Sequence, residues 1–471
     1  MQLIWFRQDL RIHDQTALWH ATQAGSTIAI VYLSPEQWKL HDDAPIKIDL
    51  YLRQLQQLKN CLAQYNIPLM VKTIPLWTDI PVHITALCQQ LNIQIVHANQ
   101  EAGFNEIQRD LAVELSLKGD NIAFELYDDR TLFPLGTIRN KSQLPYQVFG
   151  AFKKTCYEQL SISLPTCYDI PQAQPEISLD EALFKPIPQI ETFYPEFQKN
   201  DHQLAVGEAL ALDVLNQFIE DQVEFYKAER DFPALKGTSQ LSAYLNMGIL
   251  SIRQCIQALF SAQQGYLNFD SEGQQTWLDE LLWREFYQHI LYDFQRVSKH
   301  LPFKKNTQKI QWRDAPEDLK DWQYGLTGVP IVDAGMRQML ATGWMHNRVR
   351  MIVAMFLSKN LLIDWRLGEQ WFMQHLVDGD LAANNGGWQW CASTGTDSVP
   401  YFRVFNPISQ SQKFDVDGDY IRRWVPEIAH LDAKSIHDPY AKNPNIELDY
   451  PRPIVDLKQS RIRAIKKKKN I

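Results

Sequence analysis

Residues 27–33 read TIAIVYL, an uncharged run that is rich in β-branched and apolar residues. A run of this length and composition is typical of a buried strand. Between it and the next such run lies a helical stripe of Ile48, Leu52, Leu55 and Leu62. Strands that alternate with helices predict an α/β domain with a parallel, doubly wound sheet. The other expected strands are Gln2–Phe6, Pro68–Lys72, Ile93–Ala98 and Ala123–Tyr127.

The turn after the first expected strand, Arg7–Arg11, lacks the glycine patterns that bind nucleotide phosphates. It contains no GxGxxG, and GxxxxGK[ST] occurs nowhere in the chain. These absences argue against an NAD site or a P-loop at that turn. A cofactor of this domain would have to be of another kind.

Prolines recur through residues 133–200, where the periodicity weakens, and beyond them the pattern is helical without a convincing strand pair. The proline-rich stretch reads as a linker that contains some short helices. We therefore predict an α/β domain at residues 1–132, a linker at 133–200 and an all-α domain at 201–471.

The bulk composition describes a folded protein, with 471 residues, 45% hydrophobic and 22% charged. The net charge of −8 points away from a nucleic-acid binder unless basic residues cluster locally. Six scattered cysteines without CxxC, no secretory leader and no membrane-length apolar run predict a cytoplasmic protein with reduced thiols and no membrane association. The basic stretch 461–470 reads as a solvated tail, with weak DNA contact as the alternative.

One helical pattern has an unusual face. Trp277, Glu280, Trp283, Arg284 and Tyr287 share one arc, and leucines take the opposite side. Two indoles, a carboxylate, a guanidinium and a phenol suit a flat aromatic ligand with polar edges and a phosphate nearby. A surface helix with an internal salt bridge is the alternative.

A second pattern aligns Trp344, Asn347, Arg348 and Met351 at helical spacing. Arg348 could hold a phosphate, and the amide of Asn347 could read a base edge. A core face with a buried amide explains the spacing equally well.

Two further segments carry polar chemistry. Asp378 and Asp380 have no third ligand close in sequence, which argues against a metal, and Trp388 and Trp390 predict an aromatic platform for bases. The segment 238–242 (TSQLS) predicts an anion site at a helix start, with ordinary capping as the alternative. The stretch DVDGDY at 415–420 predicts a turn and not a calcium loop.

Five motifs in this order resemble those of the photolyase/cryptochrome family: WFRQDLRIHD (5–14), RDFPALKGTSQLS (230–242), WLDELLWREFY (277–287), GWMHNRVRM (343–351) and DGDLAANNGGWQW (378–390). The resemblance covers almost the whole chain and is greatest to bacterial class I photolyases, which repair cyclobutane pyrimidine dimers. It implies an N-terminal antenna domain, a C-terminal helical domain that binds flavin adenine dinucleotide (FAD), and damaged DNA as partner of a monomer. In this family a flipped-out dimer is split by an electron from light-excited, reduced FAD.

The resemblance also implies residue roles. Asp378 pairs with Arg350, and Asn384 lies beside the reactive nitrogen of the flavin. Glu280 hydrogen-bonds the flipped pyrimidines, and Arg230, Arg284 and Arg348 contact phosphates. The implied FAD contacts are Tyr226, Thr238, Ser239, Gln240, Leu241, Ser242, Trp277, Arg284, Asn347, Arg350, Asp378, Gly379, Asp380 and Asn384. The implied lesion contacts are Arg230, Glu280, Trp283, Arg284, Tyr287, Asn347, Arg348, Met351 and Trp390.

Trp312, Trp365 and Trp388 resemble the electron-hopping chain that photoreduces FAD, although core packing explains any single tryptophan. Gln37, His41, Asn105 and Glu106, with Lys299, resemble the binding site of a 5,10-methenyltetrahydrofolate antenna. A deazaflavin antenna is the rival.

Three relatives of this function remain as alternatives. A 6-4 photolyase carries histidines at the positions of Asn347 and Met351, and DASH-type cryptochromes tend to lack the equivalents of Met351 and Trp390. Plant cryptochromes carry aspartate at the position of Asn384, and signalling cryptochromes usually have a long C-terminal extension. These departures favour dimer repair; a plain flavoprotein with a chance tryptophan cluster is more remote.

Overall fold

The structure is a computed structural model of the 471-residue chain. It describes all residues except 200–201, 263–268, 270, 401–402, 442 and 469–471. The predicted boundary between linker and helical domain and the end of the basic tail lie outside the described residues. Within the described part, no helix combines the length and the apolar character that crossing a bilayer requires.

The chain divides into two compact units. Unit 1 comprises Met1–Lys199, Gln203–Val223 and Ser239–Gln295. Unit 2 comprises Asn200–His202, Glu224–Thr238 and Arg296–Ile471. This division into units does not test the domain boundaries predicted at residues 132 and 200, which stay a prediction.

Unit 1 contains the predicted parallel sheet, with strand order β3-β2-β1-β4-β5. Two strands begin later than expected. Pro68 has no N–H, and only its carbonyl pairs, with the Ala29 N–H. Ile93 still closes the end of the preceding helix through a bond to Cys88. The strands are β1 (Gln2–Phe6), β2 (Thr27–Leu33), β3 (Leu69–Thr73), β4 (Ile95–Asn99) and β5 (Ala123–Tyr127).

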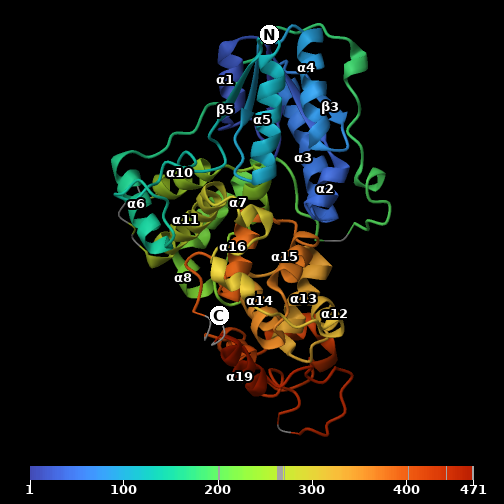
Figure 1. The fold of residues 1–471 in the computed structure, drawn as a ribbon, viewed down its shortest axis with the longest axis vertical. Helices are drawn as coiled ribbons and strands as arrows, with labels where there is room; N and C mark the ends of the chain where they lie inside the picture. Colours follow the sequence, from blue (N-terminus) through green and yellow to red (C-terminus); the bar gives the residue numbers. More distant parts are fainter. Residues whose placement is uncertain (200–201, 263–268, 270, 401–402, 442, 469–471) are drawn as a thin grey trace. The chain divides into compact units, whose positions relative to one another are not determined.

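Helices cover both faces of this sheet (Figure 1). Leu3, Trp5, Ile28 and Ile30 point to one face, where their side chains pack with α4 and α5. The alternate residues point to the other face, where α1 contacts β1 and β4 and α3 contacts β3. The helices are α1 (Thr16–Ala24), α2 (Pro35–Leu40), α3 (Pro45–Ala63), α4 (Ile80–Gln90) and α5 (Phe104–Lys118), with a short η1 (Trp77–Asp79).

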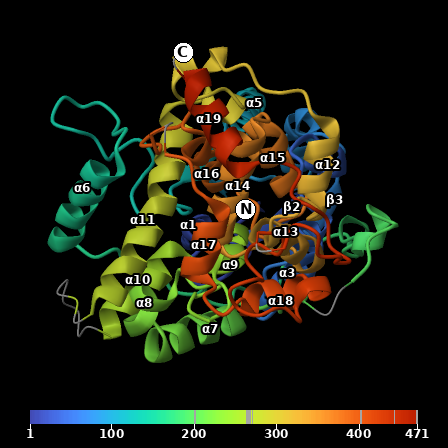
Figure 2. The same ribbon diagram turned by 90° about the horizontal axis from the view of Figure 1, so that it is seen from below.

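Unit 1 continues with a group of helices in which α6 packs on α11 and α7 on α10 (Figure 2). Arg253 of α10 ties this group to the sheet, because its buried guanidinium bonds the carboxylates of Asp14 and Asp129. The predicted linker contains short helices, as expected. The elements are α6 (Phe149–Ile162), η2 (Glu181–Leu183), η3 (Ile190–Thr192), α7 (Glu208–Asp221), α9 (Ser242–Met247), α10 (Ile252–Ala262) and α11 (Glu272–Asp293).

All regular secondary structure of unit 2 is helical in its described residues, which agrees with the predicted all-α class. Its core joins α13, α14, α15 and α16 around buried Trp322, Trp365 and Trp388. The helices are α8 (Tyr226–Glu229), α12 (Pro316–Tyr324), α13 (Pro330–Thr342), α14 (Asn347–Met355), α15 (Trp365–Met373), α16 (Leu381–Ala392), α17 (Pro407–Phe414), α18 (Asp419–Trp424) and α19 (Leu457–Lys468). Shorter turns are η4 (Val223–Phe225), which straddles both units, η5 (Val297–Lys299), η6 (Lys305–Lys309), η8 (Pro426–Ile428) and the π-helix η7 (Phe356–Leu361).

The DVDGDY stretch is a turn, as predicted. Asp415 accepts the N–H groups of Tyr420 and Ile421, and Gly418 has φ +77°. The carboxylate therefore caps α18 from inside the protein. No group of three or more His, Cys, Asp or Glu that could hold a metal occurs among the described residues.

Candidate functional site

Helix α11 of unit 1 carries the first predicted face. Trp277 is buried and packs against Phe218, with ring centroids 5.2 Å apart. Glu280, Arg284 and Tyr287 are half-buried. The helix thus presents a row of polar and aromatic groups that its own unit covers only in part.

Trp283 on the same helix stacks on Phe149 of α6, with centroids 3.7 Å apart and rings 15° from parallel. Tyr287 approaches the same indole at 5.6 Å. This indole is half-buried and held between aromatic neighbours. It is therefore a rigid apolar wall and not a mobile surface side chain.

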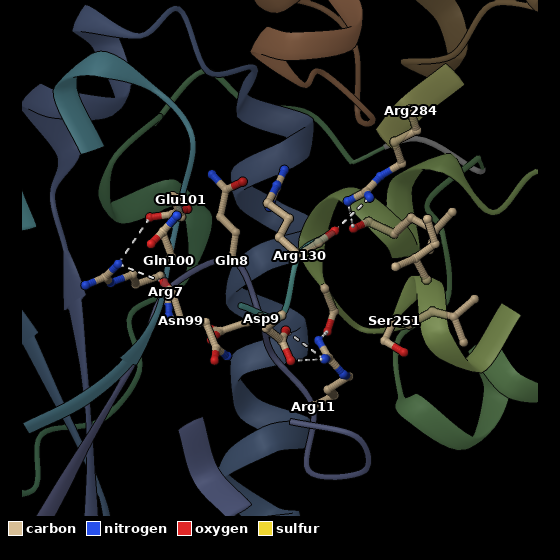
Figure 3. Close-up of a pocket in the computed structure, with 15 residues that line it drawn as sticks. Arg7, Gln8, Asp9, Arg11, Asn99, Gln100, Glu101, Arg130, Ser251 and Arg284 are labelled. Atoms are coloured by element: carbon tan, nitrogen blue, oxygen red, sulfur yellow. Dashed lines mark hydrogen bonds and ion pairs between the residues drawn. The ribbon is translucent and has the colours of Figure 1, made fainter. Parts of the chain in front are cut away.

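Arg284 donates through Nη1 to the carbonyl of Arg130 at 2.9 Å. It also lines a cavity of about 20 Å³ at the carboxyl ends of β1, β4 and β5 (Figure 3). Doubly wound sheets commonly bind nucleotides at such a switch point. Here the cavity has room for about one water, because side chains such as Arg7, Asp9 and Glu101 fill the crevice.

The predicted anion segment 238–242 does not cap a helix by its side chains. Helix α9 begins at Ser242, and the residue at the N-cap is Leu241, which has no polar side chain. Gln240 turns the backbone with φ +52°. Thr238 and Ser239 are half-buried. The capping alternative is therefore wrong.

In unit 2, Arg350 pairs with Asp378 as the resemblance implied, with Nη2 2.9 Å from Oδ2. Arg350 also donates through Nε to the carbonyl of Met345 at 2.7 Å. Asp378 is buried, and Asp380 two residues later is the N-cap of α16. The two carboxylates therefore have separate structural roles, which explains their spacing without a shared metal.

The amide of Asn384 is oriented by the protein. Its Nδ2 donates to the backbone carbonyl of Glu369 at 3.0 Å. The neighbouring Asn385 donates to the fully buried Glu369 carboxylate at 2.9 Å, and Gln389 donates to Asn385 at 2.8 Å. This chain of amides holds α16 against α15 and fixes the direction of the half-buried Asn384 side chain.

The second predicted face is partly wrong. Helix α14 begins at Asn347 with His346 as N-cap, so Trp344 precedes the helix and does not share its face. Asn347 is exposed and Met351 half-buried. Arg348 is half-buried, pairs with Asp231 at 2.8 Å and lies 4.4 Å over the ring of Phe414.

The tryptophans of α16 do not form one platform. Trp388 is 2% exposed and packs on Phe372 and Trp322, with centroids 5.0 and 5.9 Å away. Trp390 is half-buried, and residues two apart on a helix diverge by about 200°. A methyl group on Gly368 would lie 2.1 Å from Cη2 of Trp388, so the indole is tightly seated.

The three predicted hopping residues belong to one hydrophobic cluster of unit 2. Trp365 and Trp388 are buried in it, and Trp312 is partly buried against it. The indole nitrogen of Trp388 is buried without a partner among the described residues. Trp322, which the sequence did not single out, lies in the same cluster and donates to the carbonyl of Val353 at 3.1 Å.

The expected antenna residues of unit 1 come together after β2 and at the start of α5. The Nε2 atom of His41 is hydrogen-bonded to the amides of Gln37 and Asn105, each at 3.0 Å. The Trp77 ring meets His41 edge-on at 4.8 Å. Burial raises the pKa of Glu106, and nearby His41 opposes that shift. Lys299 is exposed and belongs to unit 2.

Residues 2–174 match the family model for DNA photolyase, and residues 277–470 match the model for the FAD binding domain of DNA photolyase. The chain belongs to the DNA photolyase family. It therefore contains the FAD-binding domain of that family.

Individual relatives agree over nearly the full length. The deoxyribodipyrimidine photo-lyase of Escherichia coli is 42% identical over 467 residues, which cover 98% of this chain and 97% of that one. The bacterial class III photolyase structure from Agrobacterium tumefaciens has a TM-score of 0.85 at 33% identity, covering 100% and 97%. The Synechocystis cryptochrome structure has a TM-score of 0.88 at 29% identity, covering 99% and 98%.

Each unit, taken by itself, contains side chains whose chemistry suits contacts with FAD. In unit 1, Ser239 has a hydroxyl, and the side chains of Leu241 and Trp277 are buried. In unit 2, Thr238 offers a second such hydroxyl, and Tyr226 is buried with the Arg230 guanidinium 5.2 Å over its ring. Asp380 and Asn384 add acceptors for a ribityl or isoalloxazine edge.

Sequence reasoning missed several supporting residues. Asp231, the partner of Arg348, stands beside Arg230 in a quoted motif, so an acid next to a basic residue was the available signal. The sequence around Glu369 and His346 contained no comparable pattern that pointed to them. Their importance arises because helices distant in sequence pack around them.

Proposed function

We propose that this protein is a light-dependent DNA-repair enzyme that reverses cyclobutane pyrimidine dimers, with FAD as cofactor. The observation that carries the proposal is the 42% identity over 98% of the chain to a protein named deoxyribodipyrimidine photo-lyase. The residues of the proposed lesion site agree with it, because Asn347 and Met351 stand where a 6-4 photolyase has histidines.

Residues of both units enter this proposal. In unit 1, Glu280 hydrogen-bonds the extruded pyrimidines and Trp283 packs against them, with Arg284 and Tyr287 beside them. In unit 2, Trp390 and Met351 provide apolar contact. Asn347 reads the base edge, and Arg230 and Arg348 hold the DNA backbone. The stacking of Trp283 on Phe149 supports its role, because a held indole loses little entropy when a base packs on it.

When bound and reduced, FAD supplies a light-excited electron donor. The chain's contribution beside it is the Asn384 amide, which has no acidic proton to give. Because Nδ2 is tied to the Glu369 carbonyl, the amide cannot rotate freely. Asn384 would thus favour a reduced flavin that stays anionic.

The test illuminates purified protein with dimer-containing oligothymidylate and follows the recovery of thymine absorbance. We expect recovery in light and none in the dark. A Glu280→Gln variant should bind the dimer normally but repair it with lower yield. Asp279→Asn is the matched control, because Asp279 is the neighbouring acid on α11 and bonds Lys153 and Tyr157 instead. Equal repair yields in both variants would remove Glu280 from the mechanism, and no repair by the wild type would reject the function.

We also propose a 5,10-methenyltetrahydrofolate antenna at Gln37, His41, Asn105 and Glu106, with Lys299. The bonds that join His41 to two amides support a ready-made polar cluster. Freshly purified protein should show the absorbance band of bound folate, and His41→Ala should weaken it while FAD remains. A deazaflavin band instead would reject the folate proposal.

We further propose that the protein acts as a cytoplasmic monomer. All six cysteines are unpaired, which suits a reducing compartment.

Replacing Arg348 by alanine should lower the slope of log affinity against log salt by about one unit if it contacts one phosphate. An unchanged slope would remove Arg348 from the set of phosphate contacts.

A further inference from the structure

The first turn of α14 is capped by an unusual residue. His346 occupies the N-cap position, and its Nδ1 atom accepts the backbone N–H of Arg348 at 3.1 Å. Helices are more often capped by Ser, Thr, Asp or Asn. The imidazole is 2% exposed. It therefore fixes the backbone that carries Asn347 and Arg348 without meeting solvent.

The capping residue His346 is itself hydrogen-bonded to another helix. The backbone N–H of His346 donates to Oε1 of Gln338 on α13 at 3.4 Å. The same oxygen accepts the hydroxyl of Tyr420 from α18 at 2.6 Å. Asp415 accepts the N–H groups of Tyr420 and Ile421 and so fixes the start of α18. These contacts form a buried relay from α18 through α13 to the beginning of α14.

A second attachment acts on the residue before the cap. Arg350 donates through Nε to the Met345 carbonyl and pairs with Asp378. The entry into α14 is thus fixed at consecutive residues, Met345 by the ion-paired arginine and His346 by the relay. Because the backbone is held at two adjacent residues, the directions in which the side chains of the next residues leave it are fixed.

We propose that His346, Gln338 and Tyr420 are positioning residues for the lesion contacts Asn347 and Arg348. This inference rests on the proposed function, because it concerns residues assigned to DNA there. Gln338 and Tyr420 are 8% and 1% exposed, so neither can touch DNA from its place. They act through the backbone of α14, and because Arg348 is a proposed DNA contact and Asn347 a proposed lesion contact, their main effect falls on binding of the lesion.

The state of the imidazole supports this role. Burial lowers the pKa of His346 to about 4, with Arg350, Arg348 and Arg230 adding to the shift and Asp231 opposing it. The ring is therefore neutral near pH 7. Since Nδ1 accepts from Arg348, the proton must be on Nε2, which is buried without a partner among the described residues.

The experiment compares His346→Ala with His346→Asn. Asparagine restores a side-chain acceptor at the N-cap, and alanine does not. We expect the alanine variant to bind dimer-containing duplex about fivefold more weakly, from the usual loss of an N-cap. Its repair rate at saturating DNA should stay within about twofold, and the asparagine variant should recover most of the affinity. Tyr420→Phe, which keeps the ring and removes only the hydroxyl, should weaken binding in the same direction.

A readout that needs neither light nor DNA is amide hydrogen exchange at Arg348. The N–H of Arg348 should exchange faster in His346→Ala than in the wild type or His346→Asn. Equal affinities of the alanine and asparagine variants for dimer DNA would overturn the inference. So would a Tyr420→Phe variant whose affinity equals that of the wild type. Failure of the wild type to bind or repair dimers would instead reject the proposed function, so the two failures are distinct.

Discussion

Replacing Trp388 by phenylalanine should separate photoreduction from repair at almost no cost in stability. Trp388 is 2% exposed, and shortening its ring system loses about 1–2 kcal/mol of packing. The substitution also removes an indole N–H that is buried without a partner among the described residues. Relief of such a group is worth about 1–3 kcal/mol. We therefore expect the free energy of unfolding to change by no more than about 1 kcal/mol.

Trp322 offers a matched control in the same cluster. It is also fully buried and also packs on Phe372, but its indole N–H donates to the carbonyl of Val353. Trp322→Phe loses the same packing and, in addition, a hydrogen bond worth about 1 kcal/mol. The two substitutions should thus differ by about 2–4 kcal/mol in the free energy of unfolding measured with urea.

The functional assay follows the absorbance of oxidised flavin under blue light with an external thiol reductant. Trp388→Phe should fail to photoreduce its flavin, and Trp322→Phe should succeed. Both should repair dimers when the flavin is reduced chemically. The reasoning is refuted if Trp388→Phe destabilises the protein as much as Trp322→Phe, or if its flavin is still photoreduced at the wild-type rate.

Three further outcomes follow from buried charges. Asp378→Asn removes the carboxylate that pairs with Arg350, and we expect about tenfold weaker FAD retention in a dialysis assay, from a loss of about 1.4 kcal/mol. Burial raises the pKa of Asp333 to about 6, so the folded state keeps a proton that the unfolded state releases above about pH 4. The free energy of unfolding should then fall by about 2 kcal/mol as the pH rises from 4 to 6, and urea titrations of Asp333→Asn should lack this part of the pH dependence. Arg253→Met leaves Asp14 without its cation and should cost about 3–5 kcal/mol of stability by thermal unfolding, whereas adding Asp14→Asn should recover part of that loss.

Local patterns predicted elements well because burial repeats with a short period. The five strands, the long α3 and the face of α11 all follow from spacing within a few residues. The same spacing failed at Trp344, because a helix beginning depends on the cap that the surrounding structure provides. His346 is that cap, and its sequence context gives no sign of it.

Pairings across the chain could be inferred only where a family resemblance supplied them. The pair between Arg350 and Asp378 was expected on that ground and is present. The pair between Arg348 and Asp231 was not expected, although both residues stand in quoted motifs. Nothing in either motif states which acid faces which arginine.

The sequence alone determined the elements, the family and the residue types of the proposed site, since these depend on composition and order along the chain. The tertiary structure alone decided that the indole nitrogen of Trp322 finds an acceptor and that of Trp388 does not. It also decided that the Tyr420 hydroxyl reaches Gln338, and how little space remains at the end of β1. The physical reason is that hydrogen bonds and close packing act over a few ångströms between residues that folding brings together from distant positions. Hydrophobic periodicity, in contrast, is already complete within a single helix or strand.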